Sequence, residues 1–426
     1  MAGFAGYRCS ICGQEFGPDD AQYTCPRDGG NLDVILDYDR IRRGISPGDL
    51  RRSPDTSIWR YLPLLPVQDP GHNGTPLRAV GWTPLFDLNS IAAKLNLKKL
   101  WLKDDGRNPT ASFKDRASAV AVARAQEIGA EVIVTASTGN AGAALAGMAG
   151  AAKMPAVILA PKTAPPAKIA QILIFGARVV LVEGTYDDAF DLTIQAAEQF
   201  GWYCRNTGFN PFTAEGKKTA AFEICEQLSI ASGEKSSAKE RWLTPDAVFL
   251  SVGDGNIISG LHKGFKDLLE LGWIDRIPRL YGIQSEGSAA IYNAFQAGSE
   301  DIQPVSANTL ADSISVDLPR DGLRALRAVT ETGGACVAVP DSAILGAIAE
   351  LGRDTAVFAE PAGAAAYAGL LTAVEKNLLT EGDRVVVLNT GNGLKDVVRA
   401  MDAAGEPLVI EPTLEALQSA LNAELK

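Results

Sequence analysis

Lys114 is the residue of this chain best placed to act as a nucleophile. It ends the segment Asn108-Pro-Thr-Ala-Ser-Phe-Lys114, where Asn and Pro favour a turn, and the apolar periodicity of Ala117–Ile128 predicts a helix directly after it. The positive end of a helix dipole disfavours an ammonium ion, which lowers the pKa of a lysine there and frees its lone pair to attack an aldehyde. We therefore expect Lys114 to be the catalytic residue, the alternative being a solvated lysine in a helix cap.

Three turns of small residues follow apolar runs that are typical of strands. The turns are Ser137-Thr-Gly-Asn-Ala141, Ser251-Val-Gly-Asp-Gly-Asn-Ile257 and Thr390-Gly-Asn-Gly-Leu-Lys395, after the runs Glu131–Ala136, Ala247–Leu250 and Arg384–Leu388. Gly253–Ile257 is the best candidate for a phosphate site, because N–H groups at a strand end that opens a helix converge on an anion. The carboxylate of Asp254 would repel that anion, so we expect it to point outward. The alternative is a turn in which the glycines serve only the conformation of the backbone and bind no ligand.

Together with Lys114, these turns resemble the motifs of the fold-type II pyridoxal-phosphate (PLP) enzymes, and among them those of the threonine synthases most closely. The similarity spans roughly Thr83 to Asp396, and Gly81-Trp-Thr-Pro-Leu85 at its start matches the family's Gly-x-Thr-Pro-Leu. The motifs also come in the family order. The resemblance implies that Lys114 attaches to the aldehyde of the cofactor and then serves as general base at the α-carbon of the substrate.

The resemblance also implies which residues hold the cofactor. Asn140 would hydrogen-bond the oxygen on the cofactor ring, and Thr390 would face the pyridine nitrogen. A neutral hydroxyl leaves that nitrogen largely unprotonated, so the ring is a more restrained electron sink. The expected cofactor-binding residues are Phe113, Lys114, Asn140, Gly253, Asp254, Gly255, Asn256, Ile257 and Thr390.

The reaction that the resemblance implies is that of a lyase, which converts O-phospho-L-homoserine and water to L-threonine and phosphate. Such an enzyme needs a second set of donors for the leaving phosphate, besides a loop for the substrate carboxylate. The expected substrate-binding residues are Ser112, Ser137, Thr138, Gly139, Lys168, Gln171 and Asn210. The alternative is β-elimination or β-replacement on O-phosphoserine, serine or threonine, as in a dehydratase or a cysteine- or cysteate-synthase-like enzyme.

Two further stretches match the family. Asn206-Thr-Gly-Phe-Asn210-Pro-Phe-Thr-Ala-Glu-Gly-Lys-Lys-Thr219 resembles the stretch that links a small domain to a large one, and Glu360-Pro-Ala resembles a turn at the cleft. Glu360 lies near the nitrogen edge of the cofactor by this resemblance, and a simple Glu-Pro helix cap is the alternative.

Cys9, Cys12, Cys25 and Asp28 form two closely spaced pairs near the N-terminus. Such pairs on two turns are typical of a ribbon that holds tetrahedral zinc, and a carboxylate oxygen can replace the fourth thiolate. A three-thiolate site, an empty site and a remnant ribbon packed by aromatic residues are the alternatives. The resemblance gives this module a structural role.

Composition excludes several classes of function. The 426 residues carry 51 acidic against 40 basic side chains, a net charge of -11, so we expect no binding of nucleic acid or of anionic membranes. No signal sequence and no long apolar span is present, and six cysteines fit a reducing compartment, which predicts a cytoplasmic protein. A NAD-dependent dehydrogenase would need a Gly-x-Gly-x-x-Gly turn, which is missing. The two histidines, His72 and His262, lie in no motif.

Strand-like runs alternate with helical patterns from Leu100 onward, which predicts an α/β fold. The resemblance specifies a tryptophan-synthase-β-like fold of two doubly wound parallel-sheet domains and implies a homodimer. We expect a zinc-ribbon-like module at 1–38, an extended arm at 39–84 and a catalytic body at 85–426 with a smaller mobile subdomain at about 118–212. The apolar pattern of Thr413–Leu425 predicts an amphipathic helix, which would dock on the chain or pack in an oligomer.

Overall fold

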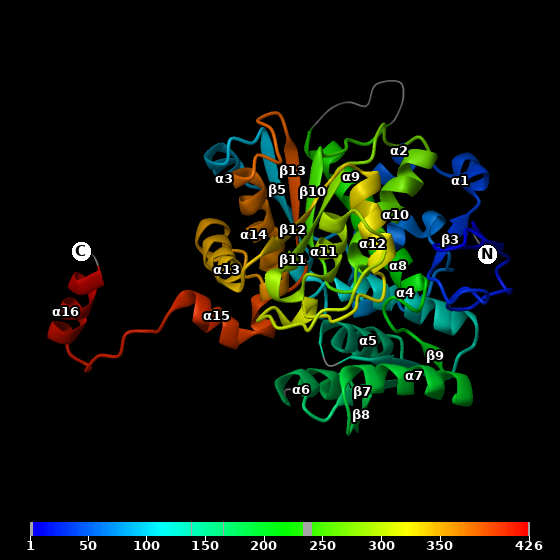
Figure 1. Ribbon diagram of the computed structural model, residues 1–426, viewed down its shortest axis with the longest axis horizontal. Coiled ribbons are helices and arrows are strands. Elements are labelled where there is room, and N and C mark those ends of the chain that lie inside the picture. The colour runs from blue at the N-terminus through cyan, green and yellow to red at the C-terminus, as the bar shows by residue number, and fades with distance from the viewer. Residues whose placement is uncertain (1–2, 138, 165, 233–240, 425–426) are drawn as a thin grey trace.

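The computed structural model describes residues 3–137, 139–164, 166–232 and 241–424 of the chain (Figure 1). For residues 166–168 and 422–424 the description is limited to the backbone.

A six-stranded sheet forms the centre of the larger domain. Its order is β12-β11-β10-β13-β5-β4, and every neighbouring pair is parallel except β4 with β5. The predicted α/β fold is confirmed, with this one antiparallel strand as a difference. Only the short helix α3 joins β4 to β5, and so short a connection favours antiparallel pairing. The strands are β4 (Leu85–Asp87), β5 (Lys99–Asp104), β10 (Ala247–Ser251), β11 (Arg279–Ser285), β12 (Cys336–Val339) and β13 (Arg384–Asn389).

Helices cover both faces of this sheet, and for that reason its central strands are near-continuous apolar runs. On one face Phe249 packs in a core with α13 and α14, and on the other Val248 and Leu250 pack in a core with α4, α9, α10 and α12. The helices are α3 (Asn89–Lys94), α4 (Lys114–Glu127), α8 (Phe212–Lys217), α9 (Thr219–Ala231), α10 (Asn256–Glu270), α11 (Ala290–Ala297), α12 (Gly322–Glu331), α13 (Asp341–Thr355) and α14 (Pro361–Glu375).

A four-stranded parallel sheet of order β8-β7-β6-β9 forms the smaller domain, at the bottom of Figure 1. Its strands are β6 (Ile133–Ala136), β7 (Ala156–Pro161), β8 (Arg178–Val182) and β9 (Tyr203–Cys204), and its helices are α5 (Asn140–Ala151), α6 (Pro166–Ile174) and α7 (Tyr186–Phe200). The sheet falls within the subdomain predicted at about 118–212.

The N-terminal module is a small antiparallel sheet of order β2-β1-β3. Its strands are β1 (Phe4–Cys9), β2 (Glu15–Phe16) and β3 (Leu32–Leu36). Phe4 packs edge-on against Phe212 at the start of α8, with ring centroids 5.8 Å apart. Tyr23 stacks on Phe209 at 4.7 Å, just beyond β9. The module therefore packs against segments that follow the smaller sheet.

The arm after this module is helical in part, where an extended segment was expected. It contains α1 (Tyr38–Gly44), α2 (Pro47–Arg51) and two 3₁₀ helices at Ile58–Leu64 and Pro76–Ala79. Ser46 caps α2 in a reciprocal capping box with Asp49, a local signal that overrides the high content of Pro and Gly.

The C-terminal segment leaves the body of the molecule. α15 (Val397–Ala404) lies against α13, and α16 (Leu414–Glu424) stands apart from the other elements in Figure 1. Within the residues described, no helix has both the length and the apolar composition needed to cross a bilayer.

Candidate active site

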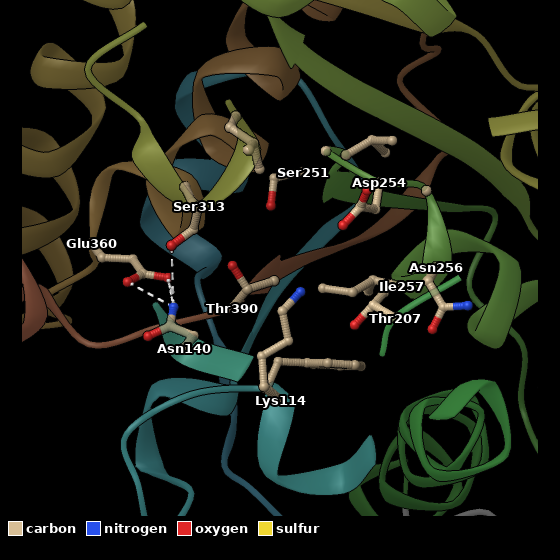
Figure 2. Close-up of a pocket in the computed structure, with 16 residues that line it drawn as sticks. Lys114, Asn140, Thr207, Ser251, Asp254, Asn256, Ile257, Ser313, Glu360 and Thr390 are labelled. Atoms are coloured by element: carbon tan, nitrogen blue, oxygen red, sulfur yellow. Dashed lines mark hydrogen bonds between the residues drawn. The ribbon is translucent and has the colours of Figure 1, made fainter. Parts of the chain in front are cut away.

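One cavity collects residues from both domains at the carboxyl ends of β10 and β13, the edge where ligands bind in open α/β sheets (Figure 2). We call it the Lys114 cavity. Its polar and glycine lining residues are Lys114, Asn140, Thr207, Ser251, Gly253, Asp254, Gly255, Asn256, Ser313, Glu360 and Thr390, beside Phe113 and Ile257. The structure thus brings together every residue expected to bind the cofactor.

Lys114 is the first residue of α4, and its amine points into the cavity (Figure 2). The turn before it is fixed by Phe113, whose N–H donates to the carbonyl of Thr390 at 2.8 Å. No described residue accepts a hydrogen bond from the Lys114 amine. The pKa of Lys114 is lowered from its ordinary 10.5 to about 8, mainly by removal from water and also by the nearby Arg205, while Asp254 and Glu360 act in the opposite direction. Burial is therefore the main cause of the low pKa, where the sequence argument had invoked the helix dipole.

The loop Gly253–Ile257, here called the cradle loop, joins β10 to α10. Gly255 has φ +92°, and a Cβ there would lie 2.6 Å from the carbonyl oxygen of Asp321, so only glycine fits. Because α10 begins at Asn256, its first N–H groups have no partner within the helix and remain available to an anion.

The side chain of Asn256 is held in place on three sides. Its amide nitrogen donates to Asp321 at 2.7 Å, and its amide oxygen accepts from Thr213 at 3.2 Å and from the buried amine of Lys217 at 2.5 Å. Lys217 therefore places its amine beside the cradle loop, and burial lowers the pKa of that amine well below its ordinary 10.5.

Asp254 does not point outward as expected. It lines the Lys114 cavity with its carboxylate turned inward (Figure 2), and the backbone N–H of Arg320 donates to it at 3.4 Å. Burial raises the pKa of Asp254, while the cations Lys114, Lys217 and Arg320 act against this rise. The expectation considered the repulsion from a phosphate and overlooked these cations, which attract the carboxylate inward.

Asn140 and Glu360 meet across the cavity. The amide nitrogen of Asn140, at the start of α5, donates to both carboxylate oxygens of Glu360 at 2.7 and 3.0 Å and to the hydroxyl of Ser313 at 3.4 Å (Figure 2). Glu360 is the N-cap residue of α14, and a Cβ at Gly391 would lie 2.1 Å from its carboxylate. The pairing gives Asn140 a partner that sequence reasoning did not foresee.

A second cavity of about 320 Å³ adjoins the first and shares Asn140, Ser313 and Glu360 with it. Gly139 and Gln171 line this cavity, and Lys395, after β13, donates to the side-chain oxygen of Gln171 at 3.0 Å. We call it the Lys395 cavity.

The other residues expected to bind substrate lie in several environments. The hydroxyl of Ser137 accepts from the N–H of Gly139 at 3.2 Å, and the buried hydroxyl of Ser112 has no hydrogen-bond partner among the described residues. Asn210 lies outside both cavities, because its side chain donates to the carbonyl of Cys204 and accepts from the N–H of Phe212. Thr138 and the side chain of Lys168 lie outside the described residues.

Arg205 is a cation that sequence reasoning missed. Its guanidinium is fully buried and donates to Thr207 at 2.7 Å and to Ser118 at 3.2 Å, and its second terminal nitrogen has no partner among the described residues. Burial lowers the pKa of Arg205 to about 10. A buried guanidinium with an unused donor favours a nearby anion. No motif marks Arg205, because only the fold brings β9 next to the cavity.

Thr207, Ser251 and Ser313 also line the Lys114 cavity without having been expected there, and Glu360 lines it as its resemblance to a turn at the cleft implied. Glu360 carried a signal in its Glu-Pro-Ala turn. The hydroxyl residues carried none, since single hydroxyls in loops are common. The four N-terminal residues expected to bind metal also lie together, with their ligand atoms all within 4.8 Å of one another.

The donor set of the Lys114 cavity fits pyridoxal phosphate. An amine that donates to no described residue suits an aldehyde, and a helix start where a Cβ would clash suits a phosphate. Lys217, which is hydrogen-bonded to Asn256, and Arg205, which is hydrogen-bonded to Thr207 and close to Asp254, place donors beside the cradle loop, and the hydroxyl of Thr390 also lines the cavity.

Comparisons with known proteins agree with this chemistry. Residues 77–391 match the family described as pyridoxal-phosphate dependent enzyme. The threonine synthase of Methanocaldococcus jannaschii is 38% identical over 416 residues, 97% of this chain and 98% of that protein. The threonine synthase of Methanosarcina acetivorans is 36% identical over 98% of this chain and 99% of that protein.

Among solved structures, the processed form of threonine deaminase isoform 2 from Solanum lycopersicum has a TM-score of 0.64 at 22% identity, covering 85% of this chain and 93% of that one. A likeness at this identity supports the fold alone. By its family match and by its relatives over nearly the whole length, the chain belongs to the pyridoxal-phosphate-dependent enzymes, in the branch of the threonine synthases.

Proposed function

We propose that this protein converts O-phospho-L-homoserine and water to L-threonine and phosphate. The observation that carries the proposal is the pairing of two cavities. The amine of Lys114 faces the cradle loop in one, and the other, which contains Lys395 and Gln171, opens directly beside it. A substrate with a phosphate two carbons from its α-carbon needs such a second site.

When bound, pyridoxal phosphate supplies an electron sink that stabilises negative charge at the substrate α-carbon. The cradle loop, with Lys217 and Arg205 close by, would hold its phosphate, and Asn140 and Thr390 would face its ring. Lys114 moves the proton at the α-carbon. A pKa of about 8 leaves part of its amine neutral near pH 7, as a general base requires.

The substrate carboxylate would bind where α5 begins. Gly139 is the N-cap residue of α5, so the first N–H groups of that helix are available to an anion, and Ser137 already fixes the loop through the N–H of Gly139. This placement would leave the γ-carbon of the substrate directed toward the Lys395 cavity.

Lys395 and Gln171 would bind the leaving phosphate. Their side chains are joined by a hydrogen bond, which fixes the ammonium group at the wall of the Lys395 cavity. A positioned cation stabilises the charge that develops on a leaving phosphate. Gln171 lies on α6 of the smaller domain, so closure of the predicted subdomain at about 118–212 would bring both groups onto the substrate.

The test is steady-state phosphate release from O-phospho-L-homoserine and from O-phospho-L-serine, with threonine measured as product. We expect a higher kcat/KM with O-phosphohomoserine. Lys114→Ala should abolish turnover and the visible absorbance of the bound cofactor without unfolding the protein. Lys395→Met should raise KM for O-phosphohomoserine and leave the cofactor absorbance unchanged. Faster release from O-phosphoserine would instead support β-elimination.

We propose further that the protein acts in the cytoplasm as a homodimer. All six cysteines are free, including the exposed Cys12, which fits a reducing compartment. The apolar face of α16, which stands apart from the rest of the chain in Figure 1, supports association with a second copy.

A further inference from the structure

Four side chains in the N-terminal module meet at one point. The sulfur of Cys9 lies 3.3 and 3.6 Å from the two carboxylate oxygens of Asp28, and the sulfurs of Cys12 and Cys25 lie 3.9 Å apart. For a tetrahedral zinc ion with Zn–S of about 2.3 Å and Zn–O of about 2.0 Å, sulfurs are about 3.8 Å apart and sulfur and oxygen about 3.5 Å apart. These three spacings are close to those around one tetrahedral ion, and all four ligand atoms lie within 4.8 Å of one another.

The two ligand pairs sit on two turns of the same shape. Cys9-Ser-Ile-Cys12-Gly13 and Cys25-Pro-Arg-Asp28-Gly29 each end in a glycine with φ +72°, whose N–H donates to the carbonyl of the first cysteine at 3.1 and 2.9 Å. In each turn the N–H of that first cysteine donates to the carbonyl five residues on, at 2.9 and 2.8 Å. Asp28 therefore occupies the position in the second turn that Cys12 occupies in the first.

Backbone N–H groups point at two of the four ligand side chains, those of Cys9 and Asp28. The N–H groups of Ile11 and Cys12 point at the sulfur of Cys9 at 3.3 and 3.5 Å, and the N–H of Gly30 donates to Asp28 at 2.9 Å. A Cβ at Gly30 would lie 2.9 Å from the sulfur of Cys9, so a side chain there would invade the site. These features have no role in the reaction described above.

We propose that Cys9, Cys12, Cys25 and Asp28 bind one structural zinc ion. On binding, zinc replaces the protons of the three thiols, and the carboxylate supplies the fourth ligand. Three sulfur ligands favour zinc over magnesium or calcium, which prefer oxygen.

The ion fixes the contacts that the module makes with the larger domain. In the first turn the carbonyl of Ser10 accepts from Arg327 on α12. Just after the second turn, Asn31 donates to the carbonyl of Gly208 at 2.9 Å and to Asp321 at 3.1 Å. Asp321 is also the partner of Asn256 in the cradle loop, so the module and the phosphate side of the Lys114 cavity share one carboxylate.

The test is the metal content of the full-length protein, purified without chelator and measured by mass spectrometry. We expect one equivalent of zinc per chain. Replacement with cobalt should give the visible bands of a tetrahedral ion together with thiolate-to-cobalt charge transfer. A protein that contains no metal and binds none from added zinc or cobalt, or one that contains iron in place of zinc, would overturn the proposal.

Variants identify the ligands, with zinc affinity measured by competition against a chromophoric chelator. Asp28→Ala and Cys12→Ser should weaken zinc binding by at least about tenfold, since even residues behind the ligands contribute about 10–100-fold. Asp28→Cys should keep the ion and increase the charge-transfer absorbance. Asp19→Asn, which changes an exposed carboxylate of the same module, is the control and should bind zinc unchanged.

The variant Asp28→Cys keeps the zinc test informative even if other variants fail to fold. Asp28→Cys gives the second turn the Cys-x-x-Cys-Gly pattern of the first, so this variant keeps every ligand position filled even if Asp28→Ala unfolds. An Asp28→Cys protein whose cobalt spectrum equals that of the parent protein would exclude Asp28 as a ligand. Chelation of the parent protein should lower its melting temperature, and chelation of Cys12→Ser should not.

Discussion

The charges around Lys114 decide how readily its amine reacts. Arg205 and Lys217 lie on the side of the cradle loop, and Asp254 and Glu360 are the carboxylates of the same cavity. Arg205 would serve a phosphate, but it also lowers the pKa of the Lys114 amine, which must lose a proton to react. Asp254 acts in the opposite direction and raises the pKa of Lys114. An inward carboxylate therefore has a role at this site, although it would repel a phosphate.

The rate at which the cofactor-free protein takes up PLP should therefore depend on pH. Only the neutral amine attacks an aldehyde, so the rate should rise with pH around a midpoint near the Lys114 pKa of about 8. Asp254 raises this pKa, so Asp254→Asn should move the midpoint to lower pH. Arg205 lowers it, so Arg205→Met should move the midpoint to higher pH. Stopped-flow absorbance measures both, and midpoints that stay at the parental pH in both variants would contradict this assignment of charges.

Parts of the site could be read from single residues, and parts could not. Lys114, Asn140, Thr390 and the cradle loop stand in recognisable turns after strands, where a local pattern is enough. Arg205, Lys217 and Ser313 reach the site only through the packing of distant segments, which no local pattern reveals. Asn210 was predicted to bind substrate because it stands in a family motif. In the structure its side chain instead hydrogen-bonds to the backbone of Cys204 and Phe212, which a local pattern does not reveal either.

At the scale of elements, prediction worked best for strands buried on both faces. The predicted limits of β10 and β13 agree with the structure to within one residue, because their apolar runs end sharply at turn residues. The strand β9 has two residues and β4 has three, which is too short for a periodic signal. The arm was expected to be extended because Pro, Arg and Gly dominate it, yet Ser46 and Ser57 begin helical turns there.

The turn between β10 and α10 should tolerate no side chain at Gly255. A Cβ there would meet Asp321 at 2.6 Å and Ala325 at 2.8 Å in addition to the strain of a φ of +92°. We expect Gly255→Ala to cost about 2 kcal/mol or more in the free energy of unfolding and to weaken PLP binding, because the cradle loop must shift.

Gly298→Ala is the matched control for this variant. Gly298 has φ +63° with nothing near its Cβ position, so the change should cost only about 1 kcal/mol and leave PLP binding unchanged. Chemical denaturation and titration with PLP give the two quantities. An equal loss of unfolding free energy in the two variants would show that the contact between residue 255 and Asp321 does not affect stability.

At the scale of the whole molecule, a buried ionic network joins segments far apart in the sequence. Arg116 on α4 donates to Asp105 and to Glu223, each at 2.6 Å, and Lys103 on β5 donates to Glu223 at 2.7 Å. Gly81 of the arm lies against the same group, since a Cβ there would come 2.7 Å from Glu223. The helix that begins with Lys114 is thus anchored through Arg116, two residues on.

Removal of the Glu223 charge should therefore destabilise the protein strongly. Glu223→Gln leaves Arg116 and Lys103 buried with too little negative charge, which costs about 3–5 kcal/mol in buried pairs. The network lowers the pKa of Glu223 from 4.5 to about 2, so its contribution is complete above pH 4.5 and is lost as the pH falls toward 2.

Denaturation curves at pH 7 and at acid pH measure this effect. The difference in unfolding free energy between Glu223→Gln and the parent protein should shrink as the pH falls from 4.5 toward 2. A difference that stays constant with pH would show that the charge of Glu223 does not contribute. Glu415→Gln on the exposed C-terminal helix is the control and should have little effect at either pH.

The C-terminal helix bears on how the whole molecule assembles. Leu414, Leu417 and Leu421 lie on one face of α16 and are 79%, 42% and 46% exposed. A helix of 11 residues is marginal in water by itself, so an isolated apolar face of this kind needs a surface to cover it. A second copy of the chain would cover this face in the homodimer proposed above. We expect Leu417→Asp and deletion of residues 406–426 to shift the protein from dimer to monomer at micromolar concentration, measured by light scattering after gel filtration. Ser419→Asp, on the opposite face of the same helix, should remain dimeric. If the deletion leaves the mass of the particle at two chains, α16 has no part in the dimer and its apolar face must pack within its own chain.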